Sequence, residues 1–165
     1  MQATTTGQTR AVAVPYLAIA GPGDATTDEI RDARELARRF AAAGVIVVCG
    51  GLDGVMGAAA QGAADAGGVC VGLLPGDDRS AAHPALTVTI PTGMGEMRNS
   101  LLVRSADVVL AVGGSWGTLS EVALAVRGGV PVVWLHGWDT PDGPVLVDSV
   151  EAAADAVNGL LPDAR

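Results

Sequence analysis

Apolar and polar residues follow one another along this chain in blocks that switch between two periods. Continuous apolar runs, typical of strands buried on both faces, lie at 12–20, 45–49, 69–74, 87–90, 107–112, 131–135 and 145–147. Segments with helical spacing lie between them at 26–43, 58–66, 94–106, 117–127 and 151–160. This alternation predicts a single α/β domain over residues 11–165, with a doubly wound (Rossmann-like), mostly parallel sheet and helices on both faces.

Two segments depart from the alternation. Residues 1–10 are polar and unpatterned, so we expect a disordered N-terminal tail. Residues 75–86 contain two prolines, adjacent aspartates and His83, and this stretch predicts a mobile surface loop. Within the helix at 94–106, we expect Met97, Leu101 and Leu102 to face the core.

Charge and composition narrow the classes of function. The net charge of −8 and the isoelectric point near 4.5 argue against a nucleic-acid partner or a membrane surface. All ten basic residues are arginine, and the lack of lysine excludes a pyridoxal-phosphate Schiff base and a P-loop lysine. No stretch approaches the ~20 apolar residues that a membrane helix needs, so we expect a cytoplasmic protein.

The cysteines and histidines do not indicate a metal site. Cys49 and Cys70 lie inside apolar runs without a CxxC pair or a Cys/His cluster, which predicts two buried free thiols in a reducing compartment. His83 and His136 have no companions at metal-ligand spacing, so we expect structural or surface roles for both. The sequence therefore predicts neither a metal nor a resident cofactor.

Three glycine turns follow predicted strands, at 21–23, 50–57 and 113–117. Ligands of an open parallel sheet bind outside the carboxyl ends of its strands, so we expect these turns to meet at one site. Glycine lets the backbone approach a ligand, and the free amides at the start of the next helix attract an anion. None of the turns matches G-x-G-x-x-G with a following acidic residue, so the pattern favours a mononucleotide over a dinucleotide.

The segment Gly114-Ser-Trp-Gly117-Thr118-Leu-Ser-Glu121 resembles the P-G-G-x-G-T-x-x-E motif of the Lonely Guy phosphoribohydrolases, which are often labelled "lysine decarboxylases". Glu96-Met97-Arg98-Asn99 stands where that family has H-x-R-K, and the turn at 50–57 resembles its third glycine loop. Gly113, Ser115, Glu96 and Asn99 replace the motifs' proline, second glycine, histidine and lysine. The sequence is closer to a branch with G-G-x-x-G-T-L-S-E and R-N that includes molybdenum-cofactor carrier proteins.

The resemblance implies a Rossmann-like homodimer or homotetramer in which neighbouring subunits complete each pocket. It also implies binding of a nucleoside monophosphate or a similar phosphate-bearing small molecule. The leading hypothesis is a nucleoside 5′-monophosphate phosphoribohydrolase, which hydrolyses the N-glycosidic bond and releases the base and ribose 5-phosphate. The alternative is a non-catalytic nucleotide or molybdenum-cofactor carrier, and a third is a structural subunit with a vestigial pocket.

Two residues are candidates for catalysis. Glycosidic hydrolysis passes through an oxocarbenium-like state, which the Glu121 carboxylate could stabilise, while the fork of Arg98 suits an anionic ligand. Each candidate also has a structural interpretation. Thr118 and Glu121 could form a helix capping box, and Arg98 could be an ordinary surface arginine. Trp116 could cover the ligand or contact a neighbouring subunit. The predicted binding residues are Gly21, Pro22, Gly23, Gly50, Gly51, Gly54, Met56, Gly57, Met94, Asn99, Gly114, Ser115, Trp116, Gly117 and Thr118.

The predicted helices at 94–106 and 117–127 carry more apolar positions than one buried stripe requires. We therefore expect both to contribute to a contact between subunits of a homo-oligomer.

Overall fold

The computed structural model describes residues 13–162, so the predicted N-terminal tail at 1–10 lies outside the described residues. Strands and helices alternate within this part of the chain, with one short 3₁₀-helix, η1. In chain order the elements are β1 (Tyr16–Ala20), α1 (Thr27–Ala42), β2 (Ile46–Cys49), α2 (Val55–Asp65), β3 (Cys70–Leu74), β4 (Val88–Pro91), η1 (Gly95–Arg98), α3 (Asn99–Arg104), β5 (Val108–Val112), α4 (Trp116–Gly128), β6 (Val132–Leu135), β7 (Val145–Val147) and α5 (Val150–Leu160).

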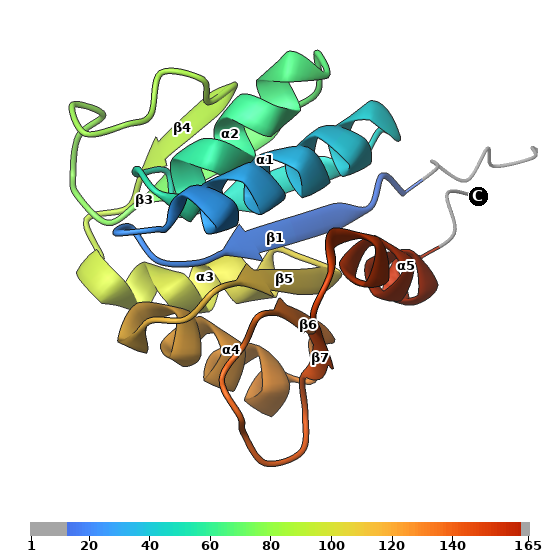
Figure 1. Cartoon of the computed structure of the whole chain (residues 1–165). Helices are drawn as coiled ribbons and strands as arrows, with labels where there is room; N and C mark the ends of the chain where they lie inside the picture. Colours follow the sequence, from blue (N-terminus) through green and yellow to red (C-terminus); the bar gives the residue numbers. More distant parts are fainter. Residues whose placement is uncertain (1–12, 163–165) are drawn as a thin grey trace, which may run out of the picture.

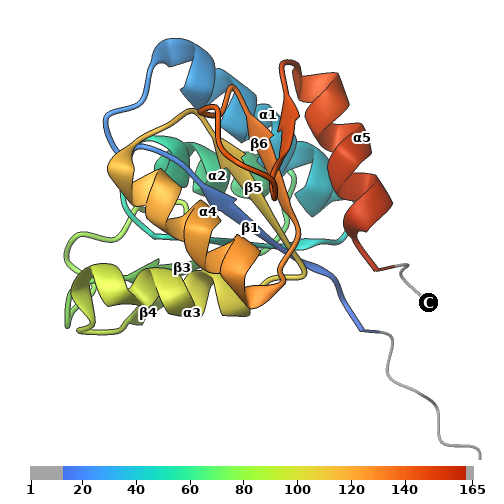
Figure 2. The same cartoon turned by 90° about the horizontal axis from the view of Figure 1, so that it is seen from below.

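The strands form one parallel sheet in the order β4-β3-β2-β1-β5-β6-β7. Helices α1, α2 and α5 cover one face, and α3 and α4 cover the other (Figures 1 and 2). The chain leaves β1 toward one edge of the sheet and leaves β5 toward the other, so a crevice opens between their carboxyl ends. The predicted doubly wound α/β fold is confirmed, and the sheet is parallel throughout.

The central strands are buried on both faces, as their continuous apolar runs predict. In β1, Leu17 and Ile19 face one core cluster and Ala18 and Ala20 face the other. The thiols of Cys49 and Cys70 lie 3.8 Å apart on β2 and β3, both buried and free, which confirms the prediction for this pair. Contact with Cys49 and burial raise the pKa of the Cys70 thiol.

Several boundaries differ from the prediction. Strand β1 begins only after Pro15, whose ring removes a backbone donor. Helix α2 begins at Val55 rather than at residue 58, because the Val55 amide donates to the Pro22 carbonyl and starts the helix early. Met56 and Gly57 therefore belong to the first turn of α2.

The predicted helix at 94–106 is instead a 3₁₀-turn followed by a short α-helix, and this break corrects the expected core positions. Leu102 is buried, but Leu101 is exposed and Met97 is 74% exposed. A 3₁₀-helix has about 3.0 residues per turn rather than 3.6, so the face that helical spacing assigns to Met97 is rotated away from the sheet.

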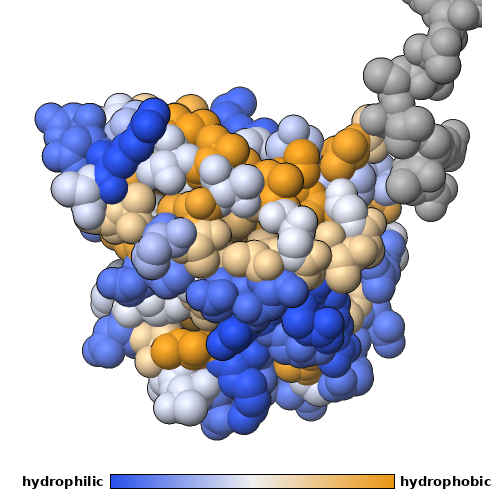
Figure 3. Space-filling model, turned by 90° about the horizontal axis from the view of Figure 1, so that it is seen from above, coloured by the Kyte–Doolittle hydropathy of each residue, from blue (hydrophilic) through white to orange (hydrophobic). Residues whose placement is uncertain are grey.

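The outer surface of α1 carries paired charges. Arg34 pairs with Asp65 at 2.7 Å, and Glu35 accepts bonds from both Arg38 and Arg39. Hydrophilic residues gather over part of this side of the molecule in the view from above (Figure 3). The predicted capping box of Thr26 with Glu29 closes the start of this helix.

The segment at 75–86 is anchored near its end to the start of α2. The His83 amide donates to the Gly51 carbonyl at 3.0 Å, and its imidazole lies against Gly57. The mobility of this segment stays a prediction. Among the helices of the described chain, none combines the length and apolarity needed to span a bilayer.

Candidate functional site

A cleft of about 310 Å³ opens at the carboxyl edge of the sheet, next to the ends of β1, β2, β3 and β5. This volume is at the lower end of the range of about 300–1,000 Å³ for small-molecule sites. The cleft lies where the strand order reverses, as the glycine turns predict. Its walls are Gly21, Gly23, Leu52, Met56, Pro75, Glu96, Arg98, Asn99, Ser115, Gly117, Thr118 and Glu121.

The structure brings nine predicted site residues into these walls: Gly21, Gly23, Met56, Arg98, Asn99, Ser115, Gly117, Thr118 and Glu121. The prediction missed Leu52, Pro75 and Glu96. Leu52 lies in the glycine turn at 50–57 and Glu96 in the segment 96–99, so their place inside these motifs could have identified them. Pro75 directly follows β3, so its position at a strand end was the available signal. The predicted residues outside the walls are Pro22, Gly50, Gly51, Gly54, Gly57, Met94, Gly114 and Trp116.

Gly50, one of these outlying residues, and Gly113, which precedes Gly114, make room for protein groups. A Cβ on Gly50 would lie 2.6 Å from Nη2 of Arg98, so this glycine lets the guanidinium reach the end of β2. Gly113 has φ +67° and lies against the carboxylate of Glu29. Proline holds φ near −65°, so the proline of the Lonely Guy motif has no place in this turn.

The start of α4 forms one wall of the cleft. Ser115 is the N-cap, because its Oγ accepts from the Thr118 amide at 3.1 Å and also bonds the Thr118 hydroxyl at 2.9 Å. Within the described residues, the amides of Trp116 and Gly117 have no protein acceptor. The positive end of the helix is therefore open to an anion.

Glu121 does not form the capping box that its spacing with Thr118 suggested, because Ser115 caps the helix instead. Glu121 is only 6% exposed and lies in the wall of the cleft. Burial raises the pKa of its carboxyl to about 7, although the charge of Arg98 acts to lower it. In the described part of the chain, its carboxylate has neither a hydrogen-bond donor nor an ion pair.

Arg98 is not an ordinary surface arginine, since it is only 7% exposed. Its Nε donates to the Leu73 carbonyl at 2.8 Å, its Nη2 to the Gly50 carbonyl at 3.2 Å, and its Nη1 to Oδ1 of Asn99. These three acceptors are neutral oxygens, and the neutral Sδ of Met56 lies 4.0 Å from Nη2. Across residues 13–162 the guanidinium forms no direct ion pair, although its charge acts on the Glu121 carboxyl in the same cleft.

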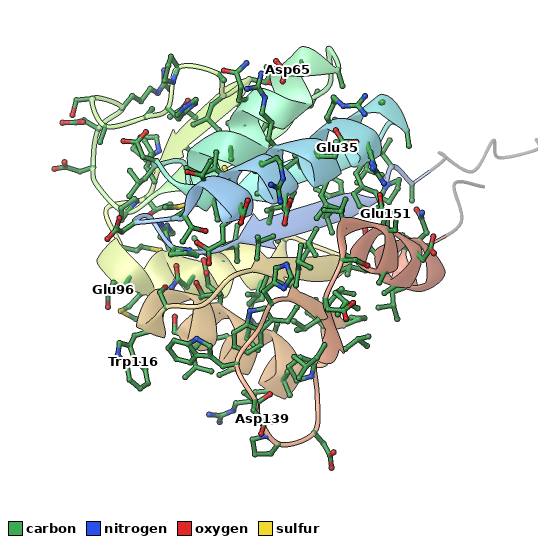
Figure 4. All side chains as sticks on the ribbon, viewed as in Figure 1. Glu35, Asp65, Glu96, Trp116, Asp139 and Glu151 are labelled. Atoms are coloured by element: carbon green, nitrogen blue, oxygen red, sulfur yellow. The ribbon has the colours of Figure 1, made fainter. Side chains whose placement is uncertain are left out.

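Trp116 lies outside the cleft walls and is 80% exposed. Its ring meets Trp138 edge to face, with centroids 5.3 Å apart at 82°. Glu96 and Trp116 project on the same side of the molecule from η1 and α4 (Figure 4). Exposed apolar residues of η1, α3 and α4, with Met94 just before η1, make up what we call the α3–α4 patch: Met94, Met97, Leu101, Trp116 and Leu124. This placement favours a subunit contact over a ligand cover for Trp116.

The two histidines lie apart from the cleft walls. Nε2 of His136 is 3.9 Å from Oδ2 of Asp32, and Nδ1 of His83 accepts from the Ala85 amide. The described residues contain no cluster of histidine, cysteine and carboxylate side chains that could hold a metal ion.

Comparison with known proteins agrees with this architecture. The model of the SLOG cluster4 family matches residues 14–158. A relative from Archaeoglobus fulgidus, described as an uncharacterized protein, is 33% identical over 145 residues, which are 86% of this chain and 91% of that protein.

Solved structures of two molybdenum-cofactor proteins are also similar. The molybdenum cofactor binding protein from the phototrophic bacterium Rippkaea orientalis has a TM-score of 0.85 and 32% identity over 90% of this chain and 98% of that chain. The molybdenum cofactor carrier protein from Chlamydomonas reinhardtii has a TM-score of 0.83 and 33% identity, with the same two coverages.

Proposed function

The chain belongs to the SLOG cluster4 family, and from this premise we propose that it binds a phosphate-bearing small molecule and acts as its carrier. The ligand class comprises the molybdenum cofactor and nucleotides. One observation supports the proposal above others: a buried guanidinium lines the cleft and is held only by neutral acceptors.

Burying a charge without a counter-ion is costly, and an anion that enters the cleft lowers that cost. The free amide of Gly117 in the other wall, with that of Trp116 next to it at the start of α4, favours the same sign of ligand charge. A phosphate group between Arg98 and the start of α4 would receive charge-assisted hydrogen bonds from both walls. In this proposal the phosphate anchors the ligand, and the rest of the ligand contacts Leu52, Met56 and Pro75.

The carrier role is favoured by the similarity to molybdenum-cofactor proteins and by two departures from the hydrolase motifs. Asn99 stands in place of the motif's lysine and bonds Arg98, while Ser115 stands in place of a glycine and caps α4. Both side chains are engaged within the protein, and the amide of Asn99 has no titratable proton to give to a leaving group.

Glu121 supports a second candidate, the nucleoside 5′-monophosphate phosphoribohydrolase. Its carboxyl has a pKa of about 7 and faces the cleft, so near neutral pH a fraction is ionised. The ionised carboxylate would stabilise positive charge at the anomeric carbon and orient the attacking water. Water would add to that carbon as its bond to the base breaks, and the proton that the water loses would end on the base, giving free base and ribose 5-phosphate.

Binding and turnover measurements separate these candidates. The carrier predicts saturable binding of AMP or GMP by calorimetry without release of free base in chromatography, and a loss of binding in Arg98→Ala. Release of base above the Arg98→Ala and Glu121→Gln backgrounds would instead establish the hydrolase. The absence of any thermal stabilisation by nucleotides or phosphate near 1 mM would overturn both and leave a vestigial pocket, because a ligand at ~100 times its Kd adds about 2.7 kcal/mol.

A further inference from the structure

We infer that Asn99 is a positioning residue that aims Arg98 into the cleft and keeps its positive charge available for the anionic group of the ligand. This inference rests on the proposed function, because it concerns how the same cleft recognises an anion.

Asn99 links the two walls of the cleft. It is buried directly beside Arg98, and its Oδ1 accepts from Nη1 of the guanidinium. Its Nδ2 donates to Oγ of Ser120 at 3.0 Å, and that hydroxyl donates to the Gly117 carbonyl at 2.7 Å. A continuous chain of hydrogen bonds therefore runs from the guanidinium to the first turn of α4.

This chain of hydrogen bonds fixes which way the side-chain amide of Asn99 points. The single proton of Ser120 is used on the Gly117 carbonyl, so its oxygen must accept from Asn99. The amide nitrogen consequently faces Ser120, and the amide oxygen faces Arg98. An aspartate could not make the same two bonds, because its ionised carboxylate has no proton to donate.

The neutrality of Asn99 matters as much as its shape. The carbonyls of Leu73 and Gly50 are neutral as well, so all three acceptors orient the fork without cancelling its charge. An aspartate at position 99 would place a full negative charge against Nη1 and form a buried ion pair. The ligand's phosphate would then have to compete with this internal carboxylate.

The isosteric change Asn99→Asp tests the inference. The matched control is Asn158→Asp, which makes the same change in net charge at an exposed position on α5. Binding of AMP, GMP and inorganic phosphate is measured by calorimetry, and the melting temperature of each variant is recorded. We expect Asn99→Asp to weaken AMP binding by about tenfold or more, while Asn158→Asp stays within about twofold of wild type.

The melting temperature separates positioning from a structural role. We expect Asn99→Asp to melt close to wild type, because the Arg98 bond is kept in a stronger, charge-assisted form. If this variant melts close to wild type and binds AMP as Asn158→Asp does, Asn99 only fills a hydrogen-bonding position and the inference is wrong.

A second variant applies if Asn99→Asp does not fold. Ser120→Ala removes the link to α4, and its control Ser105→Ala removes a hydroxyl that, among residues 13–162, bonds only the Leu102 carbonyl. We expect AMP binding to fall several-fold more in Ser120→Ala than in Ser105→Ala, and equal affinities would overturn the inference. A wild-type protein that binds neither nucleotides nor phosphate would overturn the proposed function, and this inference with it.

Discussion

Two carboxylates on helices that cover opposite faces of the sheet meet opposite environments. Glu35 lies on the outer face of α1, where bonds from Arg38 and Arg39 hold the pKa of its carboxyl at about 2. Glu121 lies in the cleft at the start of α4, where burial raises the pKa of its carboxyl to about 7. The charges on the outer face of α1 are paired with carboxylates of the same or adjacent helices, whereas Arg98 and Glu121 in the cleft form no direct ion pair.

The same contrast holds for the arginines. Arg31, Arg34, Arg38 and Arg39 of α1 each pair with a carboxylate, while Arg98 is held by neutral oxygens. Balanced surface pairs are typical of solvated helices and contribute little to stability. Burying a charged group without a partner of opposite charge costs free energy. Such a group therefore indicates a site where a ligand supplies the opposite charge.

The largest difference between the two regions is expected when one arginine is removed from each. We expect Arg98→Ala to weaken nucleotide or cofactor binding by about 2–5 kcal/mol, because a buried anion would lose its counter-charge. The surface change Arg34→Ala should leave binding intact and cost less than about 1 kcal/mol of stability. Calorimetric titration of both variants measures the difference, and equal affinities would place the anion elsewhere.

The two carboxylates should give pH dependences of opposite sign. The raised pKa of Glu121 means that stability is lost as pH rises from its ordinary value of 4.5 toward about 7. That loss is on the order of 3 kcal/mol. The lowered pKa of Glu35 means that stability is lost as pH falls from 4.5 toward about 2. Urea unfolding between pH 3 and 8 should show that Glu121→Gln flattens the first trend and Glu35→Gln the second.

If the free energy of unfolding of Glu121→Gln has the same slope with pH as that of wild type between pH 5 and 7, the Glu121 carboxyl ionises normally in the folded wild-type protein. For the hydrolase candidate, this variant should also lower turnover by on the order of a hundredfold while phosphate binding persists.

The α3–α4 patch gives a further contrast with the charged face of α1. We propose that the protein is a homodimer or homotetramer that buries this patch. The reason is that the patch contains two large exposed apolar side chains, Met97 on η1 and Trp116 on α4. Met97→Asp should weaken self-association by about 2 kcal/mol, whereas Ile30→Asp on α1 should not. Light scattering at micromolar concentration measures the mass, and a monomeric wild type would contradict the proposal.

The smallest effect concerns two matching helix caps. Ser115 caps α4 in the cleft, and Ser149 caps α5 on the other face of the sheet. Replacing either serine by alanine should cost about 1 kcal/mol of unfolding free energy. Only Ser115→Ala should also weaken ligand binding, because Ser115 orients the Thr118 hydroxyl. Equal binding by both variants would show that this cap is purely structural.

The sequence alone determined the features that depend on local pattern. Continuous apolar runs identified the buried parallel strands, the spacing of Thr26 and Glu29 identified the cap of α1, and glycine turns located the edge of the sheet where the cleft opens. It also narrowed the chemistry, because Arg98 and Glu121 belong to motifs whose residue types suit an anionic ligand. The absence of a nucleic-acid partner, inferred from net charge, stays a prediction.

Only the tertiary structure decided how the site residues are balanced. The acceptors of Arg98 include carbonyls 25 and 48 residues away in sequence, and no local pattern encodes such partners. Helical spacing could not show that Met97 is exposed, because it does not reveal where a 3₁₀-turn replaces an α-helix. Charge compensation and exposure are properties of the assembled chain, since they depend on which distant groups the fold brings into contact.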